Sequence, residues 1–216
     1  MEQKPAFFQH NLKFGGLVLL TLILFCCQKE TKKPQFTIGF SQCSDDRWRD
    51  VMNAEMRREL AFHPELKFEF RLSNGNSGQQ IEQIRELMDR GVDLLIVSPN
   101  EAKPLTPIVD EAFQKGIPVI LIDRKTESEN YTASIGADNF EIGRTAATYI
   151  ANQFEGQGEI IELQMSMSIS PAVERDRGFR VGLKPFPGLK IVEAQEVAGA
   201  PDALAQELPK LLAAHP

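Results

Sequence analysis

The stretch from Gly116 to Arg124, which reads Gly-Ile-Pro-Val-Ile-Leu-Ile-Asp-Arg, constrains the fold of this chain more than any other. A glycine suited to a turn is followed by a nearly uninterrupted apolar run, and then by an acid beside a guanidinium group. A half-exposed strand would alternate apolar and polar side chains, whereas an apolar run is typical of a strand that is covered on both faces. Ligands of open parallel sheets bind just beyond the carboxyl ends of the strands. Asp123 and Arg124 therefore stand where side chains can contact a ligand.

The rest of the chain alternates between strand and helix patterns, which predicts an α/β fold with a parallel, doubly wound sheet. Residues 36–137 contain five predicted strands, enough for a complete N-terminal lobe. Residues 138–216 supply two more strands and end after a helix, so we expect a partial C-terminal lobe and a truncated reading frame.

Local signals also predict where helices begin and which faces they bury. Ser77–Gln80 and Asp138–Glu141 have the pattern of a capping box, and Asn100 is suited to cap the helix between them. In the helix after Asp138, the spacing predicts an inward face made of Ile142, Ala146 and Ile150.

Residues 1–35 have the pattern of an export signal followed by a short linker. Basic residues precede an uncharged run from Phe14 to Cys27. At about 1.5 Å per residue, this run reaches about 21 Å, which is shorter than a hydrocarbon core of about 30 Å and typical of a secretory signal. Its end resembles a bacterial lipoprotein processing site with Cys27 as the lipidated residue; a plain signal peptide and an uncleaved anchor remain alternatives. Beyond this segment the sequence has one cysteine, Cys43, which cannot form an internal disulfide by itself. We therefore expect the fold to depend on its hydrophobic core.

Composition and missing motifs exclude several classes of function. The formal net charge of −6 argues against a nucleic-acid partner. The sequence has no dinucleotide, Walker-type or nucleophile-elbow motif, and its histidines and cysteines make no metal set, so we expect neither a cofactor nor a metal. The Asp45-Asp46 pair would suit a phosphoacceptor domain, but Ser98 stands where that domain needs its nucleophilic aspartate. We therefore do not expect an enzyme.

Polar side chains gather just after the predicted strands and at one later helix. The candidates are Gln42, Asp45, Asp46 and Trp48 after the first strand, Asn100 after the third, Asp123 and Arg124 after the fourth, Asp138 after the fifth, and Arg175 on the helix after the sixth. A sugar presents hydroxyl groups that donate and accept hydrogen bonds, together with apolar C–H faces. Carboxylates can accept from two hydroxyls, guanidinium groups can donate a rigid fork, and an indole can cover the ring. This set of side chains predicts a sugar site.

Each candidate also has a purely structural alternative. Asn100 and Asp138 could be helix caps only. Asp123 and Arg124 could form a surface ion pair, and Trp48 could belong to the buried face of its helix together with Met52.

From Phe36 onward, the chain resembles periplasmic sugar-binding proteins of the ribose-binding and lactose-repressor type. The matching stretches are Ile38-Gly-Phe-Ser41, Gly91-Val-Asp-Leu-Leu-Ile-Val-Ser-Pro99, Gly116–Arg124, Gly136-Ala-Asp-Asn139 and Glu174-Arg-Asp-Arg-Gly-Phe179. More narrowly, Phe40–Arg49, Phe62–Pro64 and Ser98–Ala102 resemble the extracytoplasmic sensor region of hybrid two-component regulators.

The resemblance implies two Rossmann-like lobes that close on a saccharide, with a hinge crossing at Gly136–Asn139. It also implies that Asp123 and Arg124 hold ring hydroxyls from the first lobe and that Arg175 reaches the sugar from the second. The corresponding function is a sensor domain in the periplasm, associated with the membrane by its signal, a lipid anchor or a spanning helix outside this chain. A full-length sensor of this type could form a homodimer. The alternative is a soluble or lipid-anchored sugar-binding protein of an ABC transporter; an α/β enzyme is a weaker third hypothesis.

Overall fold

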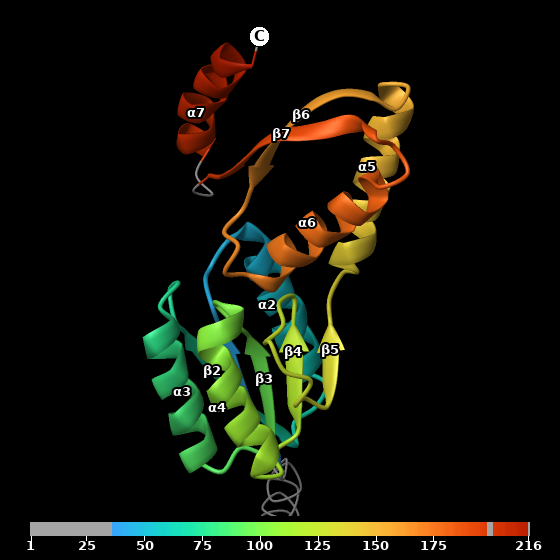
Figure 1. Ribbon diagram of the computed structural model, residues 1–216. Coiled ribbons are helices and arrows are strands. Elements are labelled where there is room, and N and C mark those ends of the chain that lie inside the picture. Colours follow the sequence, from blue (N-terminus) through green and yellow to red (C-terminus); the bar gives the residue numbers. More distant parts are fainter. Residues whose placement is uncertain (1–35, 198–200, 216) are drawn as a thin grey trace, which may run out of the picture. The chain divides into compact units, whose positions relative to one another are not determined.

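The computed structural model describes residues 36–197 and 201–215, so the predicted signal and Cys27 lie outside the described residues. We call residues 36–137 lobe one and residues 138–215 lobe two. The sheet of lobe one consists of β1 (Phe36–Gln42), β2 (Leu66–Leu72), β3 (Leu94–Ser98), β4 (Val119–Ile122) and β5 (Ala133–Ile135). Three helices alternate with these strands, namely α2 (Arg47–Leu60), α3 (Ser77–Asp89) and α4 (Ala102–Gln114) (Figure 1).

The five strands of lobe one are parallel, in the order β2-β1-β3-β4-β5. Gln42, the last residue of β1, is paired with Leu72 on β2 and with Ser98 on β3. The carboxyl ends of these strands therefore meet at one edge. The chain reverses its direction of winding beside β1, and this is the place where ligands of such sheets bind.

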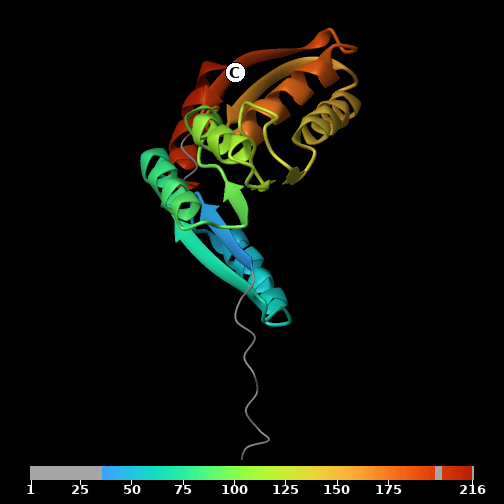
Figure 2. The same ribbon diagram turned by 90° about the horizontal axis from the view of Figure 1, so that it is seen from below.

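Helices cover both faces of this sheet, with α2 on one side and the adjacent pair α3 and α4 on the other (Figures 1 and 2). The main hydrophobic core joins Ile84 and Leu87 of α3, and Leu105 and Val109 of α4, to the strands. Three of the four residues of β4 are buried. The prediction of a buried strand in the Gly116–Arg124 stretch is confirmed.

Lobe two contains α5 (Asn139–Gln153), β6 (Gln157–Gln164), α6 (Ser170–Leu183), β7 (Gly188–Glu196) and α7 (Pro201–Ala214). In the described residues its sheet consists of the parallel pair β6 and β7. The prediction of a doubly wound α/β fold with two strands in the second lobe is therefore confirmed.

The predicted inward face of α5 is wrong at two of its three residues; the third, Ile150, is partly buried and packs against the hydrophobic core of lobe two. Ile142 and Ala146 are exposed, whereas Gly143 and Ala147 are buried. The physical reason is the close packing of α6: a Cβ atom on Gly143 would lie 2.0 Å from the carbonyl oxygen of Arg175. The backbone of α6 thus packs against the face of α5 that carries the small residues.

Two of the three predicted caps need correction. The Asn76 side chain caps α3 by accepting from the backbone N–H of Gln79 at 2.9 Å, so Ser77 is the first helical residue rather than the cap. Glu101 precedes α4 and makes no capping side-chain bond, so Asn100 is not the cap of that helix. Asp138 does cap α5, since its carboxylate accepts from the N–H of Glu141 at 2.9 Å. None of the helices in the described ranges has the length and apolarity that a membrane crossing requires.

Candidate functional site

Asp123 follows β4 in an unusual backbone conformation. Its φ angle is +66°, in the left-handed region that residues other than glycine seldom adopt. The conformation is held in place, because the Asp123 N–H donates to the carbonyl oxygen of Ile135 at 2.9 Å and the Arg124 N–H donates to that of Ile122 at 2.7 Å. Such conformations concentrate at functional sites, where the surrounding structure fixes them. The chain thus turns sharply at the residue that the sequence singled out.

Arg49 connects this turn to the start of α2. Asp46 is the N-cap of that helix and accepts from the Arg49 N–H at 3.0 Å. The Arg49 guanidinium group bonds the Asp46 carboxylate with Nη1 and donates from Nη2 to Oδ2 of Asp123 at 2.7 Å. Its side chain is 7% exposed, and its Nε is buried with no hydrogen-bond partner among the described residues. Arg49 is therefore a buried cation that holds two carboxylates at the sheet edge.

The charges in this cluster stabilise one another. Burial acts to raise the pKa of the Asp46 carboxyl, but hydrogen bonds from the backbone and guanidinium groups of Arg49 outweigh it and keep that pKa below its usual value. Burial acts to lower the pKa of Arg49, while the nearby Cys43, Asp46 and Asp123 raise it overall. Asp46 is thus held as an anion beside a permanent cation.

Arg124 lies beside this cluster but is held by a neutral partner. Its Nη1 donates to the carbonyl oxygen of Asn100 at 2.7 Å, and its Nε is 3.8 Å from Oδ2 of Asp123. The side chain is 16% exposed, so the alternative of a solvent-exposed surface pair with Asp123 does not describe it. Arg124 keeps N–H groups that can donate to a ligand.

A cavity of about 310 Å³ is formed where these side chains meet lobe two. Lobe one contributes polar groups, and lobe two contributes an apolar wall with one arginine. The lining consists of Asp46, Trp48, Arg49, Asp123, Arg124, Met165, Ile169, Pro171 and Arg175. Five of the nine predicted site residues are therefore together in one cavity.

Trp48 borders this cavity with 56% of its surface exposed, so it is not part of a buried helix face. The guanidinium carbon of Arg49 is 5.6 Å from the centre of its ring, within the range of a cation–π contact. The exposed indole of Trp48, beside the charged Arg49, can therefore cover the apolar face of a ligand ring.

Arg175 enters the cavity from α6. Its Nε donates to Oδ1 of Asn139 at 2.8 Å, and Asn139 is itself buried at the start of α5. This bond orients the guanidinium group, whose Nη1 also lies 4.0 Å from Sδ of Met165, a weak acceptor; its terminal nitrogens can still donate to stronger acceptors. The close contact of α5 with α6 thus positions a side chain of the site.

The other four predicted residues lie outside this cavity, and their binding roles remain predictions. Gln42 is buried and donates to the carbonyl oxygen of Ser44 at 2.8 Å. The Asn100 amide group donates to the carbonyl oxygen of Gly75 and to the hydroxyl of Ser77, each at 2.9 Å. Asp45 is exposed at the loop before α2, and Asp138 caps α5.

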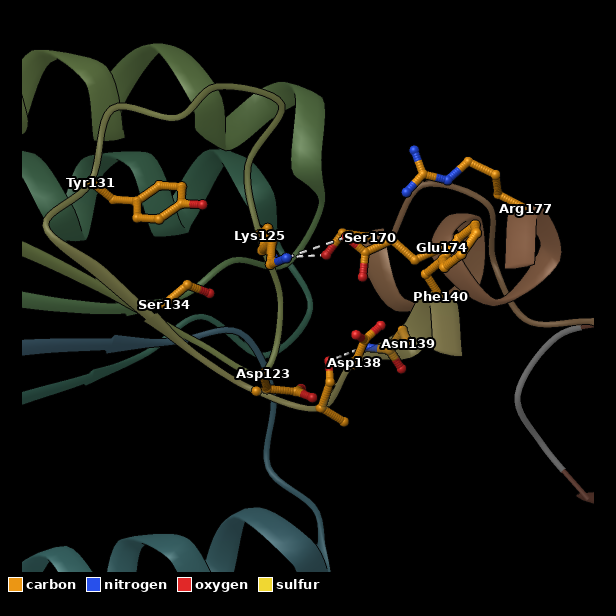
Figure 3. Close-up of a pocket in the computed structure, with 12 residues that line it drawn as sticks. Asp123, Lys125, Tyr131, Ser134, Asp138, Asn139, Phe140, Ser170, Glu174 and Arg177 are labelled. Atoms are coloured by element: carbon orange, nitrogen blue, oxygen red, sulfur yellow. Dashed lines mark hydrogen bonds and ion pairs between the residues drawn. The ribbon is translucent and has the colours of Figure 1, made fainter. Parts of the chain in front are cut away.

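A second cavity of about 450 Å³ adjoins the first at Asp123. Lys125, Tyr131 and Ser134 line it from lobe one, and Asp138, Ser170 and Glu174 from lobe two (Figure 3). Within the described parts of the chain, no group of three or more His, Cys, Asp or Glu side chains is placed to hold a metal ion.

Sequence reasoning did not select Arg49 as a site residue, although it stands among the polar residues after β1. Its partner Asp123 is 74 residues away in the chain, so no local pattern reveals the pair. The available signal was the spacing of three residues from Asp46, which places both side chains on one face of the first helical turn.

An open parallel sheet with polar groups at its carboxyl edge and a cavity bounded by a second α/β unit define a two-lobed binding protein. The chain belongs to the periplasmic binding protein domain family, whose family model matches residues 38–216. The expectation of a binding protein rather than an enzyme is confirmed by this membership.

Individual relatives agree with the family. A solved structure described as the fructose-binding periplasmic domain of hybrid two-component system BT1754 is 47% identical, with a TM-score of 0.79, and the match covers 84% of this chain and 61% of that one. The galactofuranose-binding protein YtfQ of Escherichia coli is 28% identical over 74% of this chain and 51% of its own length. The ribose import binding protein RbsB of Bacillus subtilis is 27% identical over 78% of this chain and 59% of its own length. The chain thus spans about half to three fifths of the length of these relatives.

Proposed function

We propose that this protein binds a monosaccharide in the cavity between Trp48, Asp123 and Arg175. The observation that carries the proposal is the arrangement of that cavity, in which a carboxylate–guanidinium cluster faces an apolar wall. Asp123 would accept hydrogen bonds from hydroxyl groups, Arg124 and Arg175 would donate to sugar oxygens, and Trp48 with Met165 would cover C–H faces.

The size of the cavity favours a single sugar ring. Ligand sites range from about 300 to 1,000 Å³, and a cavity of about 310 Å³ is at the lower end of that range. The 47% identical neighbour is described as fructose-binding, and neighbours at 25% and 30% identity are described as bound to arabinofuranose and fucofuranose. We therefore propose a neutral monosaccharide with a five-membered ring, and fructose as the first candidate.

The biological role we propose is that of a ligand sensor of a hybrid two-component system in the periplasm, anchored to the membrane by parts of the protein outside the described residues. Sugar binding would shift the population of closed lobes, and an output domain would read that shift. The 47% identity to a sensor domain supports this role.

A transport role is the second candidate. Neighbours described as ABC transporter binding proteins, such as one with bound D-arabinose at 25% identity and a TM-score of 0.75, match this chain over similar coverage. Deleting the gene would separate the two roles. A sensor predicts that sugar-induced transcription is lost while uptake by cells that already express the transporter continues, whereas a transport protein predicts loss of uptake itself.

A thermal-shift panel of monosaccharides and disaccharides tests the binding proposal on the full-length protein. A ligand present at about 100 times its Kd stabilises the folded state by about 2.7 kcal/mol. For a domain of this size, this corresponds to a rise in Tm of about 5–10 °C. We expect fructose or a related five-membered-ring sugar to give that rise and disaccharides to give none. A panel in which disaccharides alone stabilise the protein would contradict the proposed ligand class.

Replacing Arg49 with lysine is expected to weaken sugar binding by about 10- to 100-fold. A compact ammonium group cannot reproduce the planar fork that bonds two carboxylates at once, so Asp123 would lose the contact that orients it. Arg47→Lys is the matched control, because Arg47 is exposed on the same helical turn and does not line the cavity. Isothermal titration calorimetry would measure both variants. Equal affinities for Arg49→Lys and the wild type would show that the bridge has no role in binding.

A further inference from the structure

We propose that Ser170 and Lys125 form a clasp between the lobes that positions the two sides of the sugar site. In this role they are positioning residues: they contact other protein groups and hold the binding residues in register. The inference rests on the proposed sugar-binding function, and it adds residues that neither the sequence patterns nor the cavity at Asp123 and Arg124 had singled out.

The central contact of the clasp is a backbone hydrogen bond. The N–H of Lys125 donates to the hydroxyl oxygen of Ser170 at 2.7 Å, although the two residues are 45 positions apart (Figure 3). Lys125 directly follows Asp123 and Arg124, and this N–H belongs to the same sharp turn. Any movement of Ser170 relative to lobe one is therefore transmitted to the backbone that presents the binding pair.

Ser170 is equally close to the residues that lobe two contributes. It is the first residue of α6, which also carries Pro171 and Arg175, and both of these line the 310 Å³ cavity. One hydrogen bond thus joins the turn that holds one half of the site to the helix that holds the other half. The bond does not involve the side chains of Asp123, Arg124 or Arg175. A sugar bound to those side chains would therefore not compete with it.

Two further contacts lie around this bond. The Lys125 ammonium group is 3.4 Å from Oε1 of Glu174, one turn further along α6. The N–H of Ala102, at the start of α4, donates to the carbonyl oxygen of Ser168 at 3.0 Å. That N–H is one of the donors that have no partner within their own helix at its first turn. Lobe two supplies the acceptor for it. Residues 168–170 therefore contact two separate segments of lobe one, the connection between β4 and β5 and the start of α4.

These contacts differ in their expected importance. The Lys125 and Glu174 side chains are 42% and 24% exposed, and an ion pair between partly exposed groups contributes little. The Ser170 bond is shorter and is donated by a backbone amide whose position is fixed by the turn. We therefore assign the main effect to Ser170 and a smaller one to the Lys125 side chain.

Hydrogen exchange in the sugar-free, full-length protein tests the clasp without any knowledge of the ligand. In Ser170→Ala, the amide of Lys125 should exchange at least about fivefold faster, which is the ratio that corresponds to a typical net hydrogen bond. If the bond holds the lobes together, the amide of Ala102 should also lose protection, although it does not contact Ser170. Faster exchange at Lys125 alone, or at neither amide, would overturn the clasp.

Affinity measurements test its consequence for sugar binding. When the binding-competent arrangement is less populated, the apparent Kd rises in proportion. We expect Ser170→Ala to weaken sugar binding about fivefold, Ser170→Thr to restore it because the hydroxyl is kept, and Lys125→Met to have an effect of less than about twofold. Thr148→Ala is the control, since the exposed Thr148 hydroxyl donates to the carbonyl oxygen of Arg144 within α5. Wild-type affinity in Ser170→Ala would contradict the positioning role.

The two proposals fail in different ways. If no sugar stabilises the wild-type protein but both amides lose protection in Ser170→Ala, the sugar proposal is wrong and the clasp between the lobes stands. If a sugar binds the wild type and Ser170→Ala with equal affinity, the sugar proposal stands and the clasp has no part in binding.

Discussion

Replacing Asp123 with asparagine is expected to weaken sugar binding by at least about 30-fold. The substitution keeps the shape of the side chain and its tolerance of the left-handed conformation that this position requires, so the turn should survive. It removes the charge that faces Arg49 and one of the acceptors for sugar hydroxyls. Truncating one partner of a hydrogen-bonded buried charge pair costs about 2–5 kcal/mol in binding, of which each 1.4 kcal/mol is a factor of ten in Kd.

Isothermal titration calorimetry with the sugar found in the thermal-shift panel would measure this effect. Asp89→Asn provides a matched control, because Asp89 is exposed at the end of α3 and lies next to the amino end of β3 rather than the carboxyl edge. Circular dichroism would establish that both variants fold. If Asp123→Asn binds as tightly as the control, the cavity at Asp123 is not the sugar site.

The comparison with Asp123→Ala separates charge from conformation. Alanine tolerates the left-handed region poorly, so this variant should lose folding stability of about 1 kcal/mol in addition to its loss of affinity. A larger fall in Tm for Asp123→Ala than for Asp123→Asn would show that the turn is maintained against its intrinsic preference. Equal Tm values would show that the strain at Asp123 is small.

The fold of lobe one could be predicted because its decisive signals are local. The apolar run of β4 identifies a strand that is covered on both faces, and the same sheet edge then collects Asp46, Asp123 and Arg124 once the strands are parallel. Asp138 as a helix cap followed from its spacing to Glu141, a relation that is complete within one turn. The helix cap could be predicted because its residues are neighbours in sequence. The shared sheet edge could be predicted because parallel strands all end on the same side of the sheet.

The parts that escaped prediction depend on contacts between distant segments. Arg49 bonds Asp123 across 74 residues, and the Lys125–Ser170 contact spans 45. Hydrophobicity predicts Ile142 on the buried face of α5 and is wrong there, because the backbone of α6 packs against Gly143 instead. Periodicity identifies apolar residues but does not reveal which side of a helix a second backbone approaches.

The close packing of α5 on α6 leads to the largest effect on stability that we expect. In Gly143→Ala, the new Cβ would lie 2.0 Å from the carbonyl oxygen of Arg175 and 2.8 Å from the N atom of Phe179, both backbone atoms that no side-chain rotation can move. The helices must separate, which we expect to cost about 3 kcal/mol or more, at the upper end for overpacking. The gain of about 1 kcal/mol from replacing a helical glycine does not offset this. The separation would also displace Arg175 from Asn139, so sugar affinity should fall together with stability.

Urea unfolding of the full-length protein would measure the change, with Gly78→Ala as the matched control. Gly78 is also helical, but a Cβ there would meet only the side-chain oxygen of Asn76 at 3.3 Å, so that variant should keep the wild-type stability or gain up to about 1 kcal/mol. For a chain of this size, a loss of about 3 kcal/mol corresponds to a fall in Tm of about 6–12 °C. Gly143→Ala with wild-type stability would contradict the close contact between α5 and α6. It would also contradict the inference that this packing positions Arg175 through its hydrogen bond to Asn139.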